Sequence, residues 1–521
     1  MKKTLLSLAL ALLSSLSMSA KDYTDTLVVT VNGTASGQTA TISVDKNSDG
    51  TYNFNLKNFM LKMGGQTMGI GNITLNNLKA ATSSKGDVVT TSQNINITAG
   101  DDPNVNWMGP MLEATVGPIP LDLKLLVNEN KLYTLIDIDL QKTILNQTIH
   151  VTFGDHYQLP NSGFEDYRTE QISKLNDEYQ QVTVNVEEPL NWHSFASATG
   201  DYAQAANAFS TPHTYSASVV RPNSTGKKSL LLTSASVLGF TIANGTITTG
   251  RMQAGDMDAA NTKNCAFLST DSTSTDSHGD PFYALIGGTP DSIAVWVKFK
   301  QQTPVADHPY ATISAAITDG TYYQDPQDKV YTNVAATAKD AKIASNDFAW
   351  QRIVIPFKYN DNDVKAKAML VTISTNADPG QGSAADSLYV DDISLIYNVD
   401  APAVTVNGHA VTLDKDEVSA NATDPAKATI VATTANKGAF GAIRELSATD
   451  TQREVELLYC SDDLQTIKTY TLVINKGTET GISQIETATN KDSKVYDLNG
   501  REVKTMRHGN VYILNGKKVL K

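Results

Sequence analysis

Residues 387–398 read S-L-Y-V-D-D-I-S-L-I-Y-N, and this stretch decides how the middle of the chain is interpreted. Apolar residues alternate with polar ones around two adjacent carboxylates, Asp391 and Asp392, which is typical of a β-strand with one buried face. Adjacent carboxylates repel each other and form strands poorly, so a cation, a hydrogen-bond donor or water must lie beside them. A third carboxylate, Glu165, lies far upstream in N-S-G-F-E-D-Y. We expect these two stretches to open and close one β-sandwich.

The composition indicates several domains built from strands. The chain has 521 residues, and 40% of them are hydrophobic, so several sizeable cores are possible. The net charge of −13 argues against nucleic acid, whose phosphates require a basic surface, and against docking on anionic lipid. The two cysteines, Cys265 and Cys460, fall in different predicted domains. We expect two separate thiols, and a disulfide is the alternative that export would permit.

The first twenty residues are typical of a signal peptide. Lys2 and Lys3 precede an apolar segment at 5–16, which is shorter than the ~20 residues that span a bilayer. Small residues suited to cleavage follow in S-M-S-A, and no later stretch has the length and apolarity of a membrane helix. We therefore expect export to the cell surface or the extracellular space. The periplasm is the expected location if the C-terminal tail does not act as a sorting signal.

Residues 21–153 alternate between short strands and turns. The clearest hairpin joins 41–44 to 52–56 through N-S-D-G, where Asp-Gly supplies the positive φ of the turn. Further strands are expected at 27–31, 73–78, 88–91, 95–98, 121–127, 132–139 and 148–153. About eight strands in ~130 residues suit a small up-and-down barrel, which leaves no exposed edge.

This segment resembles the calycin-like β-barrel domain of exported Bacteroidetes proteins. The resemblance rests on K-N-S-D-G-T-Y-N-F-N-L-K-N-F, M-G-I-G-N-I-T-L, I-T-A-G-D-D-P-N-V-N-W-M-G-P-M-L, K-L-Y-T-L-I-D-I-D-L and T-I-H-V-T-F-G. It implies a lipocalin-like architecture without defining a ligand. Met60, Met63 and Met68 could line a cup for a small apolar ligand, because methionine adapts to varied shapes. The alternative is that side chains simply fill the interior.

Residues 159–398 form the largest predicted domain. Strand-like runs are separated by loops rich in Asp, Ser, Gly and Pro, which suits a jelly-roll sandwich. The region resembles a jelly-roll carbohydrate-metabolism domain of Bacteroidetes. The resemblance rests on L-P-N-S-G-F-E-D-Y, E-P-L-N-W-H-S-F, I-A-V-W-V-K-F-K, I-S-A-A-I-T-D-G, W-Q-R-I-V-I-P-F-K-Y and S-L-Y-V-D-D-I-S-L-I-Y. It implies a link to glycans and does not by itself imply catalysis.

Two smaller modules are predicted after the jelly roll. Residues 400–477 suit an immunoglobulin-like sandwich that acts as a spacer. Residues 490–521 contain two Asn-Gly turns between short alternating strands. This tail resembles the C-terminal sorting domain of type IX secretion, so the secretion machinery is the implied partner. The alternative is a small terminal domain without sorting activity.

Glu165, Asp391 and Asp392 are the predicted metal site. Ca²⁺ takes about six to eight oxygen ligands, which these carboxylates and loop carbonyls could supply. Similar jelly-roll modules hold a structural calcium with such residues. In an equally weighted alternative, the carboxylates accept backbone N–H bonds and join the strands. A glycosidase pair ~5 Å apart is the less favoured alternative, because catalytic carboxylates should face a cleft.

The predicted ligand site consists of Trp296, Asp319, Tyr322 and Tyr323. A sugar site needs an aromatic platform together with polar groups for the hydroxyls. Alternation in 293–299 buries one face and turns Trp296 and Lys298 to the other. The segment containing Asp319 follows what is expected to be a neighbouring strand, so it would complete a cup. The alternative is that Trp296 packs beneath a loop, and Trp192 and Trp350 are expected in the core.

No short signature of an enzyme is present. The chain lacks H-E-x-x-H, a P-loop, a G-x-S-x-G elbow and a dinucleotide fingerprint, and its histidines show no metal spacing. No catalytic residue is predicted, and structural Ca²⁺ is the one cofactor considered. The leading hypothesis is a cell-surface glycan-binding protein that supports carbohydrate acquisition. The alternatives are a glycoside hydrolase acting through jelly-roll carboxylates and a lipocalin-like carrier of a small apolar ligand.

Overall fold

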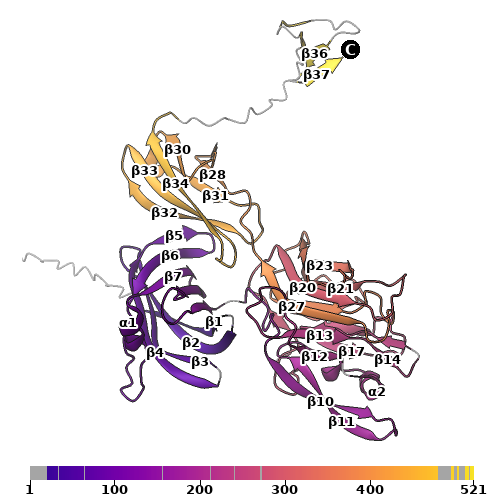
Figure 1. Ribbon diagram of the computed structural model, residues 1–521. Helices are drawn as coiled ribbons and strands as arrows, with labels where there is room; N and C mark the ends of the chain where they lie inside the picture. Colours follow the sequence, from indigo (N-terminus) through magenta and orange to yellow (C-terminus); the bar gives the residue numbers. More distant parts are fainter. Residues whose placement is uncertain are drawn as a thin grey trace, which may run out of the picture. The chain divides into compact units, whose positions relative to one another are not determined.

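The computed structural model describes residues 20–478, except 33, 64, 155, 212, 240, 270 and 272 (Figure 1). It also describes 495–497, 501–503, 511–514 and 517–520. The predicted signal peptide, apart from Ala20, lies outside the described residues. Strands dominate, and the α-helices α1 (Gly109–Val116) and α2 (Ala203–Phe209) are short. The all-β prediction is confirmed.

The chain divides into two compact units. One extends to Pro402 and includes Ala432–Leu446 and Val455–Thr471, and the other comprises Ala403–Val431, Ser447–Glu454 and the chain from Leu472 onward. The predicted spacer at 400–477 is therefore shared between the two units. No helix among the described residues is long and apolar enough to cross a membrane.

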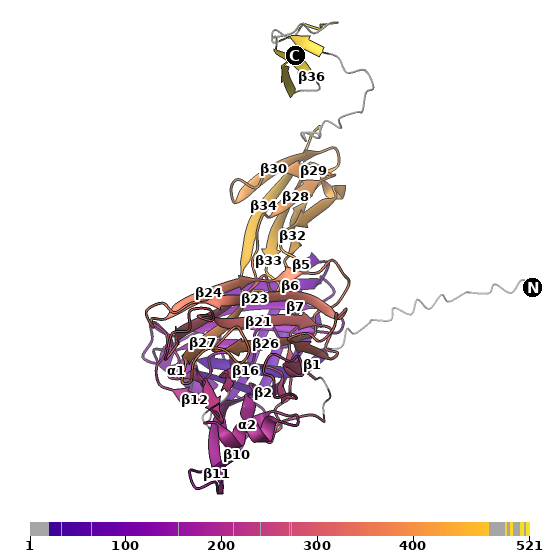
Figure 2. The ribbon, with the colours of Figure 1, turned by 90° about the vertical axis from the view of Figure 1, so that its right-hand side faces the viewer.

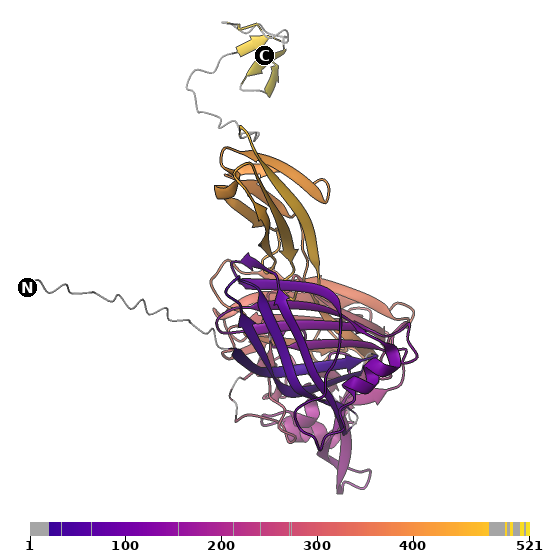
Figure 3. The same ribbon diagram turned by 90° about the vertical axis from the view of Figure 1, so that its left-hand side faces the viewer.

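The first domain is a run of antiparallel strands, drawn in indigo and purple in Figure 3. Its strands are β1 (Lys21–Val31), β2 (Thr34–Lys46), β3 (Tyr52–Met63), β4 (Gln66–Leu78), β5 (Ala80–Ser83), β6 (Gly86–Ile95), β7 (Ile119–Val127), β8 (Leu132–Asp139) and β9 (Thr148–Phe153). Their spatial order is β5-β6-β7-β8-β9-β1-β2-β3-β4. A bridge between Asn72 and Thr98 links β4 to the segment that follows β6.

Local chemistry explains the predicted hairpin and two departures from prediction in this domain. Asp49 accepts hydrogen bonds from the N–H (2.9 Å) and the hydroxyl (2.7 Å) of Thr51, and Gly50 has a φ of 85°. The separate strand predicted at 95–98 does not form. Ile95 is the last residue of β6, and Thr98 makes only an isolated bridge to Asn72. The N-W-M-G-P-M-L segment, predicted as loop, continues into helix α1, whose first turn contains a proline.

The second domain is a sandwich of two main sheets. One contains β12 (Thr214–Ala217), β13 (Ser229–Thr233), β27 (Ser387–Ile396), β20 (Ser292–Lys300) and β24 (Gln351–Pro356), in that order. The other contains β16 (Thr246–Thr248), β26 (Ala368–Ser374), β21 (Ala311–Thr318), β23 (Val334–Ile343) and β25 (Lys358–Tyr359), with β19 (Ala284–Leu285) beside β26. Figure 2 labels β16, β26, β21 and β23 of this six-stranded sheet.

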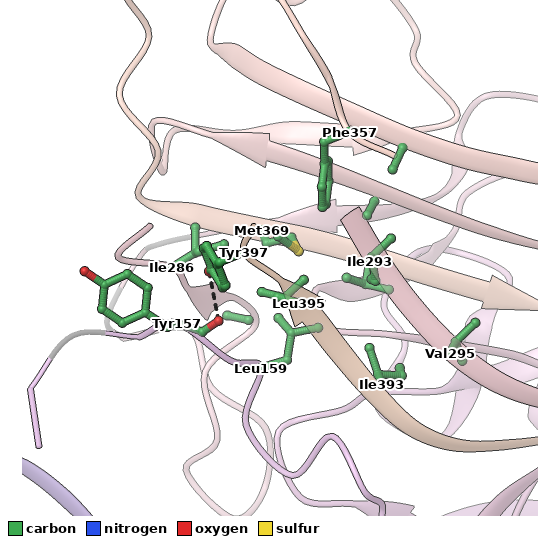
Figure 4. Packing of buried hydrophobic residues seen from close by; sticks show 14 of the residues in the cluster. Tyr157, Leu159, Ile286, Ile293, Val295, Phe357, Met369, Ile393, Leu395 and Tyr397 are labelled. Atoms are coloured by element: carbon green, nitrogen blue, oxygen red, sulfur yellow. Dashed lines mark hydrogen bonds between the residues drawn. The ribbon is translucent and has the colours of Figure 1, made fainter. Parts of the chain in front are cut away.

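The core of the sandwich lies between these sheets. Ile293 and Val295 from β20 pack in the same cluster as Met369 from β26 (Figure 4). The predicted inward face of β20 is confirmed, because Ile293, Val295, Val297 and Phe299 are all fully buried.

A β-bulge accounts for the adjacent carboxylates in β27. Val390 and Ile393 are both buried although three positions separate them, which plain strand alternation does not allow. The register between β20 and β27 shifts between Ala294 and Trp296, and Asp392 has a φ of 40°. The extra residue restores the inward direction of Ile393.

The opening segment of the sandwich runs beside β27, as expected. The N–H of Ile393 donates to the carbonyl of Ser162 at 2.9 Å. The Gln158 amide exchanges two hydrogen bonds of 2.8 Å with the backbone of Leu395. The Tyr397 hydroxyl donates to the carbonyl of Tyr157 at 2.9 Å, a contact drawn in Figure 4.

Smaller elements decorate the sandwich. The hairpin of β10 (Tyr167–Leu175) and β11 (Gln181–Pro189) projects from the domain in Figures 1 and 2. A three-stranded sheet of β17 (Arg251–Ala254), β18 (Asn264–Leu268) and β22 (Tyr323–Asp325) packs against outer residues of β21 and β26. The remaining short pieces are β14 (Ala235–Val237), β15 (Thr241–Ala243) and the 3₁₀ turn η1 (Phe195–Ser197).

The rest of the chain is also built from strands. These are β28 (Ala403–Val406), β29 (His409–Val411), β30 (Glu417–Ala422), β31 (Ile430–Thr433), β32 (Phe440–Ala448), β33 (Gln452–Cys460) and β34 (Ile467–Lys476), with the 3₁₀ turn η2 (Pro425–Lys427). In the described part of the tail, β35 (Val495–Asp497), β36 (Val511–Leu514) and β37 (Lys517–Leu520) form one sheet. Cys265 and Cys460 are free and buried, and burial raises the pKa of Cys265 to about 11.

Candidate functional site

The three carboxylates of the predicted calcium site all contact the loop at 221–228. Glu165 accepts the N–H groups of Lys227 (2.9 Å) and Lys228 (3.1 Å). The N–H of Arg221 donates to Asp391 Oδ2 at 2.9 Å, and its side-chain Nε contacts Asp392 Oδ2 at 2.5 Å. Among the described residues, these carboxylates are not a group whose oxygens converge on one point. The geometry therefore favours the alternative in which N–H groups join this loop to the strands.

Asp391 is the unusual member of this set. Its side chain is fully buried, and its Oδ1 has no hydrogen-bond partner. Burial, reinforced by the charge of Asp392, raises the pKa of Asp391 to about 6 against the opposing bond from Arg221. Asp391 therefore titrates in the mildly acidic range.

Trp296 is not an open platform. It is half-buried on the outer face of β20, directly opposite Asp391 on β27. The Arg221 guanidinium lies 5.5 Å from the centre of its ring, so a loop residue covers the indole. The alternative that Trp296 packs beneath a loop describes its position better than the predicted sugar platform does.

The expected cup of four residues does not form. Asp319, Tyr322 and Tyr323 follow β21, which belongs to the six-stranded sheet, whereas Trp296 belongs to the five-stranded one. The prediction treated β20 and β21 as neighbours because they are consecutive in sequence, but the chain crosses from one sheet to the other between them. Asp319 instead accepts the N–H (2.9 Å) and hydroxyl (2.6 Å) of Thr321 and stabilises a turn.

The two other tryptophans of the second domain divide between core and surface. Trp192 is fully buried and packs on Phe164 with ring centres 5.2 Å apart, so its predicted core position is confirmed. The same prediction is wrong for Trp350, which is half-buried and contacts Tyr389 edge-on at 6.3 Å. Trp350 precedes β24, whose alternation leaves its side chain outside the sandwich.

Aromatic side chains do gather around two of the predicted residues. We call this group the tyrosine patch, and its members are Phe267, Tyr322, Tyr323 and Tyr331. The ring of Tyr322 stacks on Phe267 at 5.7 Å with an interplanar angle of 27°, and 46% of the Tyr322 residue remains exposed. Tyr323 is buried and contacts Tyr331 at 5.2 Å. The patch therefore has a buried base and an exposed upper ring.

A cavity of about 220 Å³ with a mixed polar and apolar lining shares Tyr323 with the tyrosine patch. Tyr323 belongs to both, and the apolar floor of the cavity comes from β21, β23 and Leu370 of β26. Its polar lining consists of Ser314, Asp325, Gln327, Thr337 and Lys339. Ser314 donates to Asp325 Oδ2 at 2.5 Å, and Gln327 donates to the Tyr323 hydroxyl at 3.3 Å. Tyr323 is the one patch residue that lines the cavity, and the exposed ring of Tyr322 is not part of that lining.

A second cavity, of about 350 Å³, lies beside charged side chains that were not predicted as a site. Arg168 is nearly fully buried and contacts the carboxylates of Glu170, Glu188, Asp276 and Asp280. We call these five residues the Arg168 cluster. Glu188 lies in the E-P-L-N-W-H-S-F motif and Asp276 in the loop at 269–280. Nothing in the sequence links two segments ~90 residues apart to one another, so the cluster was not predicted.

The interior of the first domain is largely filled. Met60 is half-buried, Met68 is 40% exposed, and the Met63 side chain lies outside the described residues. The barrel interior is lined by buried aliphatic and aromatic residues, among them Leu27, Ile42, Phe54, Leu121 and Phe153. Met68 therefore turns to the surface and does not line a cup, whereas the prediction for Met63 lies outside the described side chains.

Residues 20–156 match the family of the calycin-like beta-barrel domain. The match covers β1 to β9 and confirms the resemblance of this segment. Comparisons with curated proteins and with solved structures gave no match. The calycin-like barrel supports at most a role in ligand binding, and it says nothing about the jelly roll.

Proposed function

We propose that this protein is an exported glycan-binding protein of a bacterial cell surface, and that the tyrosine patch is its platform. The signal-peptide pattern and the sorting-type tail support export to the surface. The resemblance of 159–398 to a carbohydrate-metabolism domain supports a glycan as the ligand and a role in carbohydrate acquisition. The secretion machinery is then the partner that recognises the tail.

The exposed ring of Tyr322, stacked on Phe267, is the observation that carries this proposal. The apolar face of a pyranose packs on an aromatic ring, and such a ring is best held rigid by another ring beneath it. Phe267 holds one face of Tyr322, and the Tyr322 hydroxyl is fixed by a 2.9 Å bond to Gln324 Oε1. Less rotational entropy is then lost when a sugar binds.

We assign the polar half of the proposed site to the cavity that shares Tyr323 with the patch. Asp325, Gln327 and Lys339 offer both acceptors and donors, as hydroxyl recognition requires. At about 220 Å³ the cavity is smaller than the ~300–1,000 Å³ typical of pockets that enclose a ligand. The site therefore suits one residue of a longer chain that passes over the surface.

A glycan array with the purified mature protein tests this proposal. Replacing Tyr322 with alanine should lower affinity for the retained glycan at least tenfold, which corresponds to about 1.4 kcal/mol. Tyr215→Ala is the matched control. Tyr215 is also partly exposed (36%), but it lies on β12 of the five-stranded sheet, which contains no residue of the patch. Equal retention of the wild type and the Tyr322 variant would reject the patch as the platform.

A carrier role for the calycin-like barrel is the second candidate, and the family match favours it. Native mass spectrometry of the whole chain, purified without organic solvent, should then show a bound small apolar molecule that is released on unfolding. A spectrum containing only the mass of the polypeptide would argue against this role. The glycoside hydrolase alternative is less favoured, because Glu165 and Asp391 are occupied by N–H groups of one loop.

A further inference from the structure

The Arg168 cluster contains more negative than positive charge. The guanidinium lies 2.7–3.2 Å from oxygens of Glu170, Glu188, Asp276 and Asp280. One cation therefore faces four carboxylates in a nearly buried place. Arg251 lines the adjoining cavity and contributes one further positive charge. A net charge of about −2 remains, and burial of uncompensated charge is costly.

Two of the four carboxylates are held by the protein itself, Glu188 through both of its oxygens and Asp280 through Oδ2. Glu188 accepts the N–H of Ser194 at 2.7 Å, the hydroxyl of Ser194, and Arg168 Nη2 at 2.8 Å. Asp280 accepts Arg168 Nη1 at 3.0 Å and the N–H of Asn191 at 2.8 Å. Glu188 and Asp280 therefore neutralise and position Arg168.

Glu170 and Asp276 line the cavity and retain capacity for a further partner. Asp276 Oδ2 is buried and receives no hydrogen bond of acceptable geometry, although Arg168 Nη2 lies 2.7 Å away.

His193 provides an independent indication of a ligand. It is fully buried, and neither ring nitrogen has a hydrogen-bond partner. Its Nε2 lies 3.4 Å from Asp276 Oδ2, and its ring packs at 4.5 Å on Phe282, which lines the same cavity. Buried polar groups in folded proteins are nearly always paired. Among the described residues, the long contact with Asp276 is thus the one polar approach to this imidazole, and its Nδ1 has none, so the protein does not itself complete the polar contacts here.

We propose that Glu170, Asp276 and His278 bind a divalent metal ion of the Zn²⁺ type. Among the described residues, these three form the group whose ligand atoms all lie within 4.8 Å of one another. His278 Nδ1 and Glu170 Oε1 are 3.3 Å apart, close to the ~3.4 Å between two ligands of a tetrahedral ion bound at ~2.1 Å. An imidazole with two carboxylates suits Zn²⁺ better than Ca²⁺, which prefers oxygen alone.

The surroundings suit this ion. Its two positive charges balance the excess of negative charge in the Arg168 cluster. Ser277 Oγ lies 2.8 Å from His278 Nδ1 and from both oxygens of Glu170, and a metal ion bound at Nδ1 would replace the contact between Ser277 and His278. His193 Nε2 can donate to Asp276 and orient it, as outer partners of metal ligands commonly do. The cavity leaves room for a fourth ligand from solvent or from a bound molecule.

Isothermal titration of the tag-free mature protein, dialysed against chelator, tests the proposal with Zn²⁺ and Co²⁺ alone. We expect one ion per chain, and visible d–d absorption of bound Co²⁺ that indicates mixed nitrogen and oxygen ligands. His278→Gln should weaken binding at least tenfold. This variant should fold normally, because the His278 side chain is 42% exposed.

His308→Gln is the matched control, since His308 is a second loop histidine whose Nδ1 contacts a carboxylate, Asp378, at 2.7 Å. It should bind Zn²⁺ as the wild type does. Glu170→Gln should also weaken binding, with the fold checked by circular dichroism. The proposal fails if neither ion binds, or if His278→Gln and Glu170→Gln both bind as tightly as the wild type. It is independent of the tyrosine patch, which shares no residue with it.

Discussion

Trp296 and Asp391 lie directly opposite each other on β20 and β27, and Arg221 connects them from the loop above. Its guanidinium covers the indole at 5.5 Å, and its N–H binds the Asp391 carboxylate at 2.9 Å. Residues assigned to two separate sites by sequence therefore belong to one cluster. Its geometry indicates that it holds the outer loop to the sheet.

Asp391 should make stability depend on pH. Its folded-state pKa of about 6 exceeds the ordinary value of 3.8, so the folded protein holds this proton more tightly than the unfolded chain does. The resulting stability is fully present below pH 3.8 and is lost as the pH rises through about 6. We expect a loss of about 2 kcal/mol between pH 4 and 7, measured by urea unfolding followed by tryptophan fluorescence.

In Asp391→Asn this decrease should be absent. Asp361→Asn, at an exposed position, should retain it. A pH profile of Asp391→Asn that matches the wild type would show that another group is responsible.

Arg221→Ala should uncover Trp296. The variant loses the cation–π contact and the ion pair with Asp392, so we expect a loss of about 1–2 kcal/mol in the free energy of unfolding. The tryptophan emission should also shift to longer wavelength as the ring meets water. Lys227→Ala, in the same loop but with an exposed side chain, should change neither quantity. An unchanged emission maximum in Arg221→Ala would contradict the covered position of Trp296.

Calcium at Glu165 and Asp392 remains a prediction from the sequence, and the geometry favours a purely hydrogen-bonded role. We therefore expect the same melting temperature in calcium and in chelator. Glu165→Gln should lower the free energy of unfolding by about 1–2 kcal/mol, because the hydrogen bonds from the N–H groups of Lys227 and Lys228 lose their charged acceptor. The exposed neighbour variant Asp166→Asn serves as control. A rise in melting temperature with calcium that disappears in Glu165→Gln would restore the metal interpretation.

Gly100→Ala should loosen one end of the calycin-like barrel. A Cβ added at Gly100 would overlap the ring of Trp107, which cannot shift freely because its Nε1 donates to Asp102 at 2.9 Å. We expect a destabilisation of about 1–3 kcal/mol, measured as a lower melting temperature. At Gly37 the nearest atom to an added Cβ is Val28 Cγ2 at 3.9 Å, so Gly37→Ala should be tolerated. Equal melting temperatures for the two variants would show that Trp107 is not tightly packed.

Some features of the site could be predicted, because they depend on residues close together in sequence or on strands of clear periodicity. Alternation identified the buried face of β20 and the outward direction of Trp296. The N-S-D-G turn and the pairing of the opening segment with β27 were also predicted. The spacing of Val390 and Ile393 contained the signal of a β-bulge, which plain alternation overlooked.

Other features depend on how the chain crosses between sheets. Trp296 and Tyr322 lie only 26 positions apart, yet Trp296 belongs to the five-stranded sheet and Tyr322 immediately precedes β22 of the three-stranded sheet. Arg168 meets Asp276 although 108 positions separate them. Periodicity reports which face of a strand is buried, and it carries no information about which strand lies next to it.

The sequence by itself determined the all-β class, the calycin-like first domain and the strand β27 that contains the two adjacent carboxylates. These follow from local alternation and turn chemistry, which act within a few residues. Only the tertiary structure decided which charges meet. It paired Asp391 with Arg221 and Trp296, gathered four carboxylates around Arg168, and separated Trp296 from the tyrosine patch. The physical reason is that electrostatic and packing contacts act through space, and the order of strands in a sheet sets those distances.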